Sequence, residues 1–264
     1  MDDRRARITK FNAASKWKKR GLALVPTMFG IAFGLKFMNQ GGALVHIYRD
    51  GSVLVSHGGI EMGQGLYTKV IQIASKVLGV PVDMIHTAET ATNLVPNTSP
   101  TAASYSSDIN GWAVKDACEQ IMKRLDYVIE RHHTASWTEI IEKAYMERIS
   151  LSASGFWKSR KVTWDPVTRI GRRWNYYCYG ELDSHFTGTI NKISGASASE
   201  VEIDLLTGEH QQVASHVVMD VGRSLNPAVD IGQVEGAFVQ GLGLFTMEEQ
   251  LFSPNGSLLT RGPG

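Results

Sequence analysis

Apolar positions along the chain follow two different periods, and their order predicts a mixed fold. Two β-rich runs, 43–48 and 53–57, are joined by an Asp-Gly dipeptide at position 50, which is a strong hairpin signal. The runs 199–205 and 213–218 repeat this pattern around a Thr-Gly turn at position 207. Short strands are also predicted at 22–25, where Pro26 stops the run, and near 84–87. The sequence therefore predicts at least two hairpins.

Four other segments place apolar residues three and four positions apart, as amphipathic helices do. They are 66–77, 109–128, 137–146 and a segment that starts after Asn226-Pro227. Ser136 and Glu139 fit a capping box at the start of the third helix. The predicted fold class is α+β, with mixed sheets and packed helices.

The first 20 residues form a basic lead-in that we predict to be partly helical. Eight of the 27 basic residues lie there: Arg4, Arg5, Arg7, Lys10, Lys16, Lys18, Lys19 and Arg20. We interpret this charge as a solvated face, in preference to an anion site. The chain is accordingly divided into a lead-in at 1–20 and a body at 21–264.

Composition narrows the class of protein. With 264 residues and 43% hydrophobic positions, the chain can bury a sizeable core. Outside the lead-in the charge is net acidic, so we expect no nucleic-acid partner. We find no apolar run long enough for a membrane span and no signal peptide. Two cysteines cannot form a four-cysteine iron–sulfur site, and they fit a reducing, cytoplasmic location.

The segment 57–65 is the most informative local feature, because four glycines lie between a predicted strand and a predicted helix. Glycine lets backbone approach a ligand closely, and the first helical amides can point free N–H groups at an anion. Gln64 adds a side-chain amide that can donate and accept. The alternative is a tight strand-to-helix connection without a ligand.

Two further segments are candidates for ligand contact. The loop 97–107 combines small residues with serine hydroxyls, although it could simply cap the helix that begins near Asp108. The segment 226–240 contains glycines, which lower the stability of a helix and usually serve close packing. Its Gln233 and Gln240 offer polar groups that a ligand could contact. The histidines form no metal-binding pair, and the Gly-x-Ser-x-Gly elbow of hydrolases is missing from the sequence.

Taken in order, these segments resemble the molybdenum-cofactor-binding domain of the xanthine dehydrogenase and aldehyde oxidase family. The matching blocks are Asp50-Gly51-Ser52-Val53, 57–65, 95–104, 199–204, and 219–238 with its Met219-Asp220-Val221-Gly222 start. The likeness spans about residues 4–264. It implies that the cofactor is molybdopterin with molybdenum, and that the full-length enzyme also holds two 2Fe-2S clusters and FAD.

The resemblance also implies a set of site residues. Those at the cofactor are Met62, Gly63, Gln64, Ala103, Ser104, Tyr105, Ser106, Ser107 and Gln233, and those at the substrate are Phe33, Gly34, Ala102 and Ala103. Ala103 would lie nearest to molybdenum through its backbone. Phe33 would pack on the substrate ring, while Gly34 replaces a threonine often found in xanthine enzymes. The redox and oxygen-transfer chemistry would be carried out by the cofactor.

The implied reaction is hydroxylation of an electron-poor carbon, with oxygen from water. The block 98–104 favours a purine such as hypoxanthine or xanthine, and an aldehyde substrate is the alternative. A non-catalytic scaffold remnant is the alternative of another class. The resemblance also implies a homodimer, in which this domain is joined to iron–sulfur and flavin domains.

The chain departs from the family pattern in two places. It stops at Gly264, before the Gly-Glu-Pro-Pro-like segment that carries the catalytic base. We therefore expect a domain fragment that is inactive alone, with no catalytic residue of its own. Segment 181–195 is an apparent insertion, either a lineage-specific loop or retained non-coding sequence.

Overall fold

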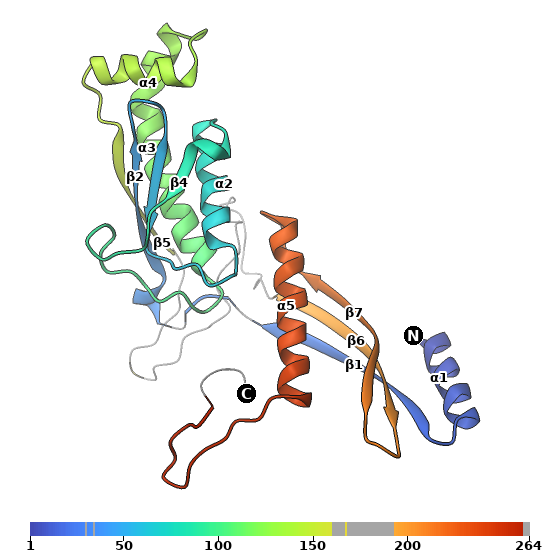
Figure 1. Cartoon of the computed structure of the whole chain (residues 1–264). Helices are drawn as coiled ribbons and strands as arrows, with labels where there is room; N and C mark the ends of the chain where they lie inside the picture. The colour runs from blue at the N-terminus through green and yellow to red at the C-terminus, as the bar shows by residue number, and fades with distance from the viewer. Residues whose placement is uncertain (30, 34, 160–166, 168–192, 261–264) are drawn as a thin grey trace. The chain divides into compact units, whose positions relative to one another are not determined.

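The chain folds into two compact units (Figure 1). The computed structural model describes residues 1–29, 31–33, 35–159, 167 and 193–260. One unit, here the first unit, joins Met1–Val25 to Ala196–Gly264, and the second unit is Pro26–Gly195. Each unit is described by itself below.

The second unit is built on a four-stranded sheet in the order β4-β3-β2-β5. Its strands are β2 (Gln40–Ile47), β3 (Val53–His57), β4 (Ile85–Thr87) and β5 (Ser152–Lys158). Strands β2 and β3 pair antiparallel from Ala43 opposite His57 to Ile47 opposite Val53, which confirms the predicted hairpin. Every second residue of β2 is buried, as expected for a sheet covered on one face.

Three helices accompany this sheet: α2 (Leu66–Leu78), α3 (Ser106–Arg131) and α4 (Trp137–Met146). Helix α3 contacts β2, β5 and α2, and so provides the centre of the core. Its buried face includes Ile109, Ala113, Ala117, Ile121, Leu125 and Val128. The capping box of Ser136 and Glu139 is present at the start of α4, as predicted.

A single glycine lets α3 approach the sheet. A Cβ atom on Gly155 in β5 would lie 1.9 Å from the carbonyl oxygen of Ala113 and 2.7 Å from the amide nitrogen of Ala117. Both are backbone atoms of α3, so a side chain here would push the helix off the sheet. This contact fixes the position of α3, whose first turn lies at the predicted cofactor loop.

The first unit combines α1 (Asp2–Ala14) and α5 (Pro227–Thr246) with a sheet in the order β1-β6-β7. The strands are β1 (Lys18–Phe29), β6 (Ile193–Asp204) and β7 (His210–Asp220). Strand β1 continues through Pro26, so the prediction that Pro26 ends it is wrong. Proline is tolerated because β1 is an edge strand, where one backbone donor is dispensable.

The predicted insertion lies mostly outside the described residues. Only its last three positions, 193–195, are described, and they begin strand β6. Whether 181–195 is an insertion stays a prediction.

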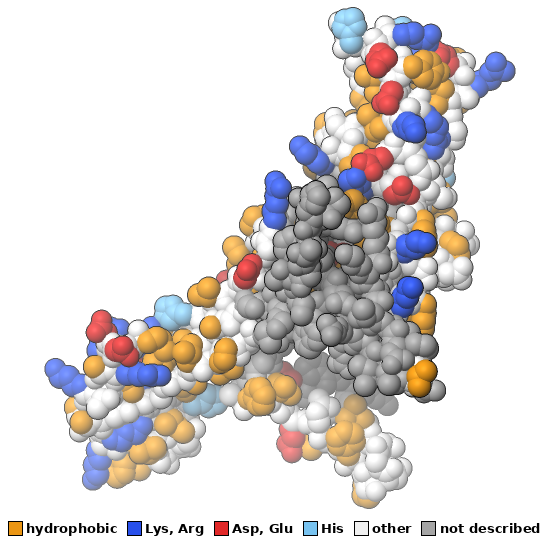
Figure 2. All heavy atoms as spheres, turned by 180° about the vertical axis from the view of Figure 1, so that it is seen from behind, with side chains coloured by type: hydrophobic (Ala, Val, Ile, Leu, Met, Phe, Trp, Pro, Cys, Tyr) orange, Lys and Arg blue, Asp and Glu red, His pale blue; other side chains and the backbone are white. Residues whose placement is uncertain are grey.

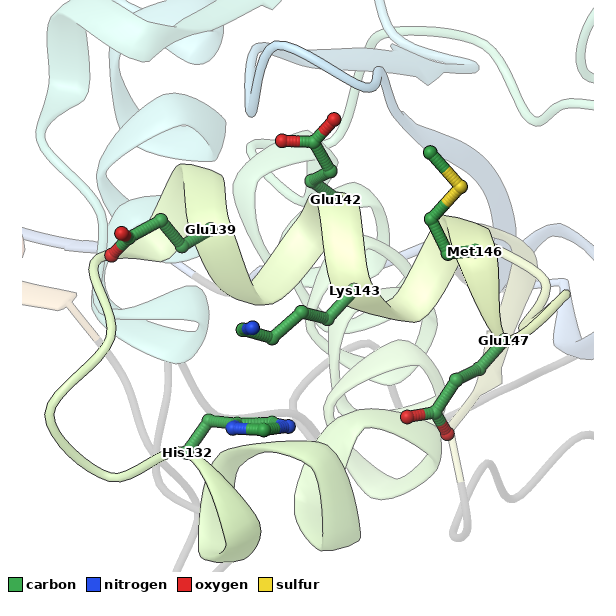
Figure 3. A pocket seen from close by; sticks show the side chains of 6 residues that line it. All are labelled: His132, Glu139, Glu142, Lys143, Met146 and Glu147. Carbon is green, nitrogen blue, oxygen red and sulfur yellow. The ribbon is translucent and has the colours of Figure 1, made fainter.

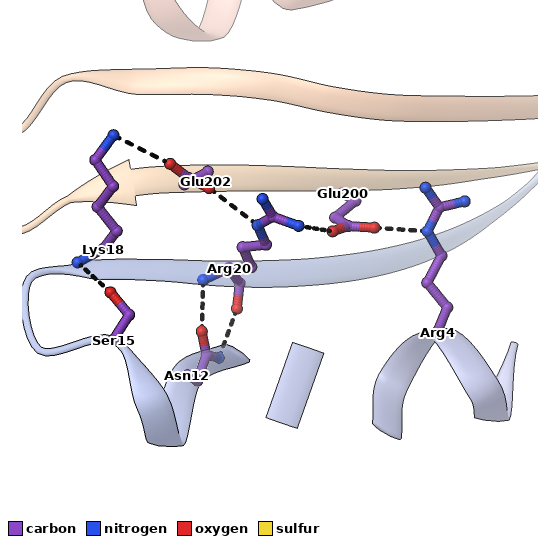
Figure 4. A network of polar contacts seen from close by, with 7 residues as sticks. All are labelled: Arg4, Asn12, Ser15, Lys18, Arg20, Glu200 and Glu202. Carbon is purple, nitrogen blue, oxygen red and sulfur yellow. Dashed lines mark hydrogen bonds and ion pairs between the residues drawn. The ribbon is translucent and has the colours of Figure 1, made fainter. Parts of the chain in front are cut away.

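Arg4, Lys18 and Arg20 of the basic lead-in form ion pairs with strand β6, so its interpretation as a solvated face is wrong for these three (Figure 4). Other basic residues of the lead-in, Arg5, Arg7, Lys10 and Lys16, are exposed as predicted. Glu200 is buried on β6, and its carboxylate pairs with Arg4 at 2.6 Å and with Arg20 at 3.4 Å. Glu202 pairs with Arg20 at 2.9 Å and with Lys18 at 3.4 Å. These three positive charges connect α1 and β1 to the acidic residues of strand β6.

Both units expose some hydrophobic side chains among the charged ones (Figure 2). Helix α5 is the extreme case, since none of its residues is buried and Phe245 is 85% exposed. No described helix has both the length and the apolar character that a membrane crossing requires.

Candidate cofactor site

The loop between β3 and α2 contains glycines of two kinds. A Cβ atom on Gly58 would lie 2.2 Å from Cγ2 of Thr98, and one on Gly59 would lie 2.4 Å from Cδ2 of Leu66. These two glycines therefore serve packing. Gly63 is different, because its φ is +98° and nothing lies within 4 Å of its Cβ position. The part of this loop that a ligand can reach is centred on Gly63.

The carboxylate of Glu61 occupies the start of α2. It accepts hydrogen bonds from the backbone N–H groups of Gly63 at 2.9 Å, Gly65 at 3.0 Å and Tyr67 at 2.9 Å. The prediction that the first amides of this helix are free for an external anion is therefore wrong for Gly65 and Tyr67. Partial burial acts to raise the pKa of Glu61, but these amide hydrogen bonds outweigh it and lower the pKa below its ordinary value.

The side chain of Gln64 forms two hydrogen bonds with the backbone of the same loop. Its Oε1 accepts from the backbone N–H of Met62 at 2.7 Å, and its Nε2 donates to the carbonyl oxygen of Ile60 at 2.9 Å. Met62 itself is 61% exposed. Gln64 therefore holds Met62 in place, and both ends of its amide already have a partner in the loop.

His57 ends β3 and is only 2% exposed. Its Nδ1 accepts from the backbone N–H of Gly59 at 3.1 Å, so the neutral ring carries its proton on Nε2. Burial lowers the pKa of His57 to about 4, although the charge of Glu61 acts in the opposite direction. Nε2 finds no hydrogen-bond partner among the described residues, and the ring meets Tyr67 edge to face at 5.1 Å. The neutral ring of His57 thus holds the backbone of Gly59 at the entry to the loop.

The second loop, 97–107, turns sharply before α3. Ala103 and Ser104 have φ values of 57° and 52°, a left-handed conformation that is unusual for two successive non-glycine residues. Ala102 and Ser104 are exposed, while the Tyr105 side chain is buried in a cluster with Ala32 and Ile109. The small residues therefore face outward, directly before the N-terminus of a 26-residue helix.

Hydrogen bonds hold the two loops together. The backbone N–H of Ile60 donates to Oγ1 of Thr101 at 3.0 Å. Asn110, buried on α3, accepts from the N–H of Gly58 at 3.2 Å and donates to the carbonyl oxygen of Ser106 at 2.9 Å. The relative position of the two loops is thus set by the second unit itself.

The predicted substrate residue Phe33 lies beside the second loop. The backbone N–H of Ala32 donates to the carbonyl oxygen of Ala103 at 3.1 Å. Asn39, which is 1% exposed, accepts from the N–H of Phe33 and donates to the carbonyl oxygens of Phe33 and Leu35, at 2.9–3.0 Å. The ring of Phe33 packs against the cluster of Tyr105 and Ile109. Gly34 lies outside the described residues.

The second unit therefore brings most of the predicted site together. Its three segments hold Phe33, Met62, Gly63, Gln64, Ala102, Ala103, Ser104, Tyr105, Ser106 and Ser107. Gln233 is exposed on α5 of the first unit, and its role stays a prediction. Sequence reasoning missed the supporting residues His57, Glu61, Thr101, Asn110 and Asn39. For Glu61 a signal existed, because a carboxylate shortly before a helix commonly caps it.

The geometry suits a polar, anionic ligand. The backbone around Gly63 is open, the residues at 102–104 are small, and α3 points its N-terminus toward this loop. The positive end of a long helix favours negative charge. Within the described ranges, no three His, Cys, Asp or Glu side chains lie close enough to hold a metal ion.

An open cavity of about 570 Å³ lies elsewhere, between the end of α3 and α4 (Figure 3). It is lined by His132, Glu139, Glu142, Lys143, Met146 and Glu147. Its carboxylates already have partners, since Glu142 pairs with Arg49 at 2.7 Å, Glu147 with Arg131, and Glu139 caps α4. None of the predicted site residues lines this cavity.

The chain belongs to the family of molybdopterin cofactor-binding domains, because the model of that family matches residues 1–264. Within it, the chain falls in the xanthine dehydrogenase and aldehyde oxidase group, as its sequence predicts. It is 54% identical to xanthine dehydrogenase/oxidase of Gallus gallus over 261 residues, and 48% identical to aldehyde oxidase 2 of Mus musculus over 260 residues. These matches cover 99% and 98% of this chain but only 18% of each relative.

Solved structures confirm the fold. Quinoline 2-oxidoreductase from Pseudomonas putida 86 superimposes with a TM-score of 0.74 at 20% identity, over 98% of this chain and 34% of that one. Aldehyde oxidoreductase from Desulfovibrio gigas gives 0.70 at 22% identity, over 92% of this chain and 25% of that one. The predicted α+β class is therefore confirmed as the fold of this domain.

Proposed function

We propose that this chain is the molybdopterin-binding part of a molybdenum hydroxylase that acts on purines. The observation that carries the proposal is the junction of the two loops, 57–65 and 97–107, through Ile60, Thr101 and Asn110. The junction places open backbone at Gly63 in one rigid frame with small residues at 102–104. A flat, polar cofactor needs a surface of this kind.

Each part of the frame has a distinct task in this proposal. The backbone of Met62 and Gly63, with Gln64, lines the pterin, and Gln233 adds a further hydrogen bond from α5. Segment 103–107 holds the polar edge of the cofactor, where the N-terminus of α3 compensates negative charge. Ala103 leaves room for molybdenum because its side chain is a single methyl group. When bound, this cofactor supplies the oxygen transfer and the electron acceptance that protein side chains lack.

Substrate binding is assigned to Phe33 and its surroundings. The Phe33 ring is held at its backbone by Asn39 and lies next to the loop of Ala102 and Ala103. A fixed aromatic face next to small residues favours a planar ring by stacking. The proposed substrate contacts are Phe33, Gly34, Ala102 and Ala103.

A purine is favoured over an aldehyde by the block 98–104 and by the higher identity to xanthine dehydrogenase/oxidase, 54% against 48%. An aldehyde oxidase-type activity is the second candidate, and a non-catalytic scaffold is the third. In this proposal, the rest of a cytoplasmic enzyme supplies two 2Fe-2S clusters, FAD, the catalytic base and a homodimer interface. This chain alone would then be inactive.

Cofactor content tests the proposal. The 264-residue chain is purified from cells that make molybdenum cofactor, and pterin and molybdenum are measured per polypeptide. We expect about one of each, and we expect Ala103→Leu to lose both because the side chain would fill the space left for the metal. Ala135→Leu, in the turn before α4, is the control. A folded chain without pterin would contradict the proposal and favour the scaffold.

The substrate is tested in a full-length polypeptide that carries this sequence. We expect turnover of hypoxanthine to exceed that of an aromatic aldehyde. Phe33→Ala should raise KM for hypoxanthine, whereas Phe37→Ala, an exposed aromatic four residues away, should not. A preference for the aldehyde would favour the second candidate.

A further inference from the structure

Glu61 is an exposed carboxylate that accepts hydrogen bonds from three backbone amides of the loop 57–65 and the start of α2. We propose that Glu61 is a positioning residue, whose carboxylate fixes the backbone of Met62-Gly63-Gln64 in the conformation that receives the pterin. This inference rests on the proposed function for its ligand, but the positioning itself is testable without any ligand.

The geometry of the carboxylate supports this role. Oε1 accepts from Gly63 and Gly65, on both sides of Gln64, and Oε2 accepts from Tyr67 in the first turn of α2. One side chain therefore ties the tip of the loop to the helix that follows. Gly63 and Gly65 have φ values of +98° and +76°, which only glycine adopts without strain. These turns direct the amides of Gly63 and Gly65 at the carboxylate of Glu61.

A carboxylate is required because three donors converge on it. An ionised carboxylate only accepts, whereas glutamine would present one oxygen and one NH₂ group. The NH₂ group would face at least one backbone N–H, so a hydrogen bond would be lost and two donors would oppose each other. The positive end of α2 further favours an anion at this place.

Glu61 and Gln64 form hydrogen bonds with different backbone groups of the loop. Glu61 takes the amides of Gly63, Gly65 and Tyr67, and Gln64 takes the amide of Met62 and the carbonyl oxygen of Ile60. The carboxylate of Glu61 supplies the negative charge at the start of α2, so the first amides of this helix are already occupied. Glu61 thus sets the shape of the loop.

The first test uses the cofactor-free 264-residue chain and residue-resolved amide hydrogen exchange. In Glu61→Gln, we expect the protection of the Gly63, Gly65 and Tyr67 amides to fall by about tenfold or more, since the charge is removed from all three hydrogen bonds and at least one of them is lost. Glu139→Gln is the matched control, because Glu139 also accepts a backbone hydrogen bond at a helix start, from the N–H of Ser136 at 2.7 Å before α4. The control should leave these three amides unchanged.

A second variant separates positioning from general damage to the fold. Glu61→Ala vacates the carboxylate site, so acetate should restore protection of the three amides, while chloride at equal ionic strength should not. Unchanged protection in Glu61→Gln, or equal effects of acetate and chloride in Glu61→Ala, would overturn the proposal.

Pterin content completes the experiment. In chains purified from cofactor-making cells, we expect Glu61→Gln to retain at most about a fifth of the pterin of the wild type, a change that one lost charged hydrogen bond can produce. Full retention by Glu61→Gln would overturn the positioning role. A wild-type chain without pterin, but with protection that depends on Glu61, would contradict the proposed function while leaving the positioning of the loop intact.

Discussion

The two units of the chain are stabilised by different means. In the second unit, α3 buries an apolar face against β2, β5 and α2, and residues such as Ile121 and Leu125 are fully buried. Among the described residues of the first unit, only Ile8, Ala198 and Glu200 are buried. That unit relies on strand pairing and on the ion pairs of Glu200 and Glu202. The loops of the proposed cofactor site belong to the unit that has its own core.

This comparison predicts opposite effects for one chemical change made in the two units. Gly155→Ala should destabilise the second unit by about 3 kcal/mol or more, because the methyl group collides with the α3 backbone. Gly241→Ala in α5 meets nothing within 4 Å and should stabilise the helix by up to about 1 kcal/mol. Urea unfolding of each variant measures both. A tolerated Gly155→Ala would contradict the packing described for α3.

The buried histidine makes the second unit sensitive to acid. Since the folded-state pKa of His57 is about 4 and its ordinary value is 6.5, the unfolded chain binds the proton first as pH falls. Stability should therefore decrease between pH 6.5 and pH 4 by about 3 kcal/mol, and level off below pH 4. His57→Gln should remove this part of the pH dependence. His86→Gln, at an exposed position of β4, should not alter it.

The first unit should become less stable when its buried carboxylate, Glu200, is removed. Glu200→Gln weakens the pairs with Arg4 and Arg20, and we expect a loss of about 2 kcal/mol because the group is desolvated. Hydrogen exchange should rise in α1 and β1 and stay unchanged in α3. An equal response in α3 would show that the two units unfold together.

Helix caps give the smallest and sharpest comparison. Ser136→Ala removes the side-chain cap of α4 and should cost about 1 kcal/mol of the stability of the second unit. Asn226→Ala removes the acceptor for Ala228 and Val229 at α5, which has no buried residue. Its effect should be confined to exchange in the first turn of α5. Circular dichroism melting with residue-resolved exchange distinguishes the two responses.

Local patterns were sufficient to predict most elements of the fold. The Asp-Gly turn, the capping box at Ser136 and the spacing of apolar residues along α3 each act within a few residues, so the sequence displays them directly. The end of β1 was predicted wrongly, because tolerance of Pro26 depends on the place of its strand at a sheet edge. That place is set by pairing with residues about 180 positions away in β6.

The candidate site was predictable in its residues but not in its internal bonds. Glycine spacing and family resemblance pointed to Gly63 and Ala103. Neither could show that Gly58 and Gly59 pack against Thr98 and Leu66, since those contacts join separate loops. The role of Glu61 was missed because the helix amides were assigned to an external anion. The ion pairs of the basic lead-in were missed for another reason, because their partners Glu200 and Glu202 lie far along the chain in β6.

Hydrogen exchange of the wild-type chain with and without bound cofactor tests the central claim most directly. If the second unit carries a preformed cofactor frame, added protection should appear at 60–65 and 101–107, and α4 should remain unchanged. Added protection around the cavity of α3 and α4, or none in the two loops of a chain that holds pterin, would contradict the account.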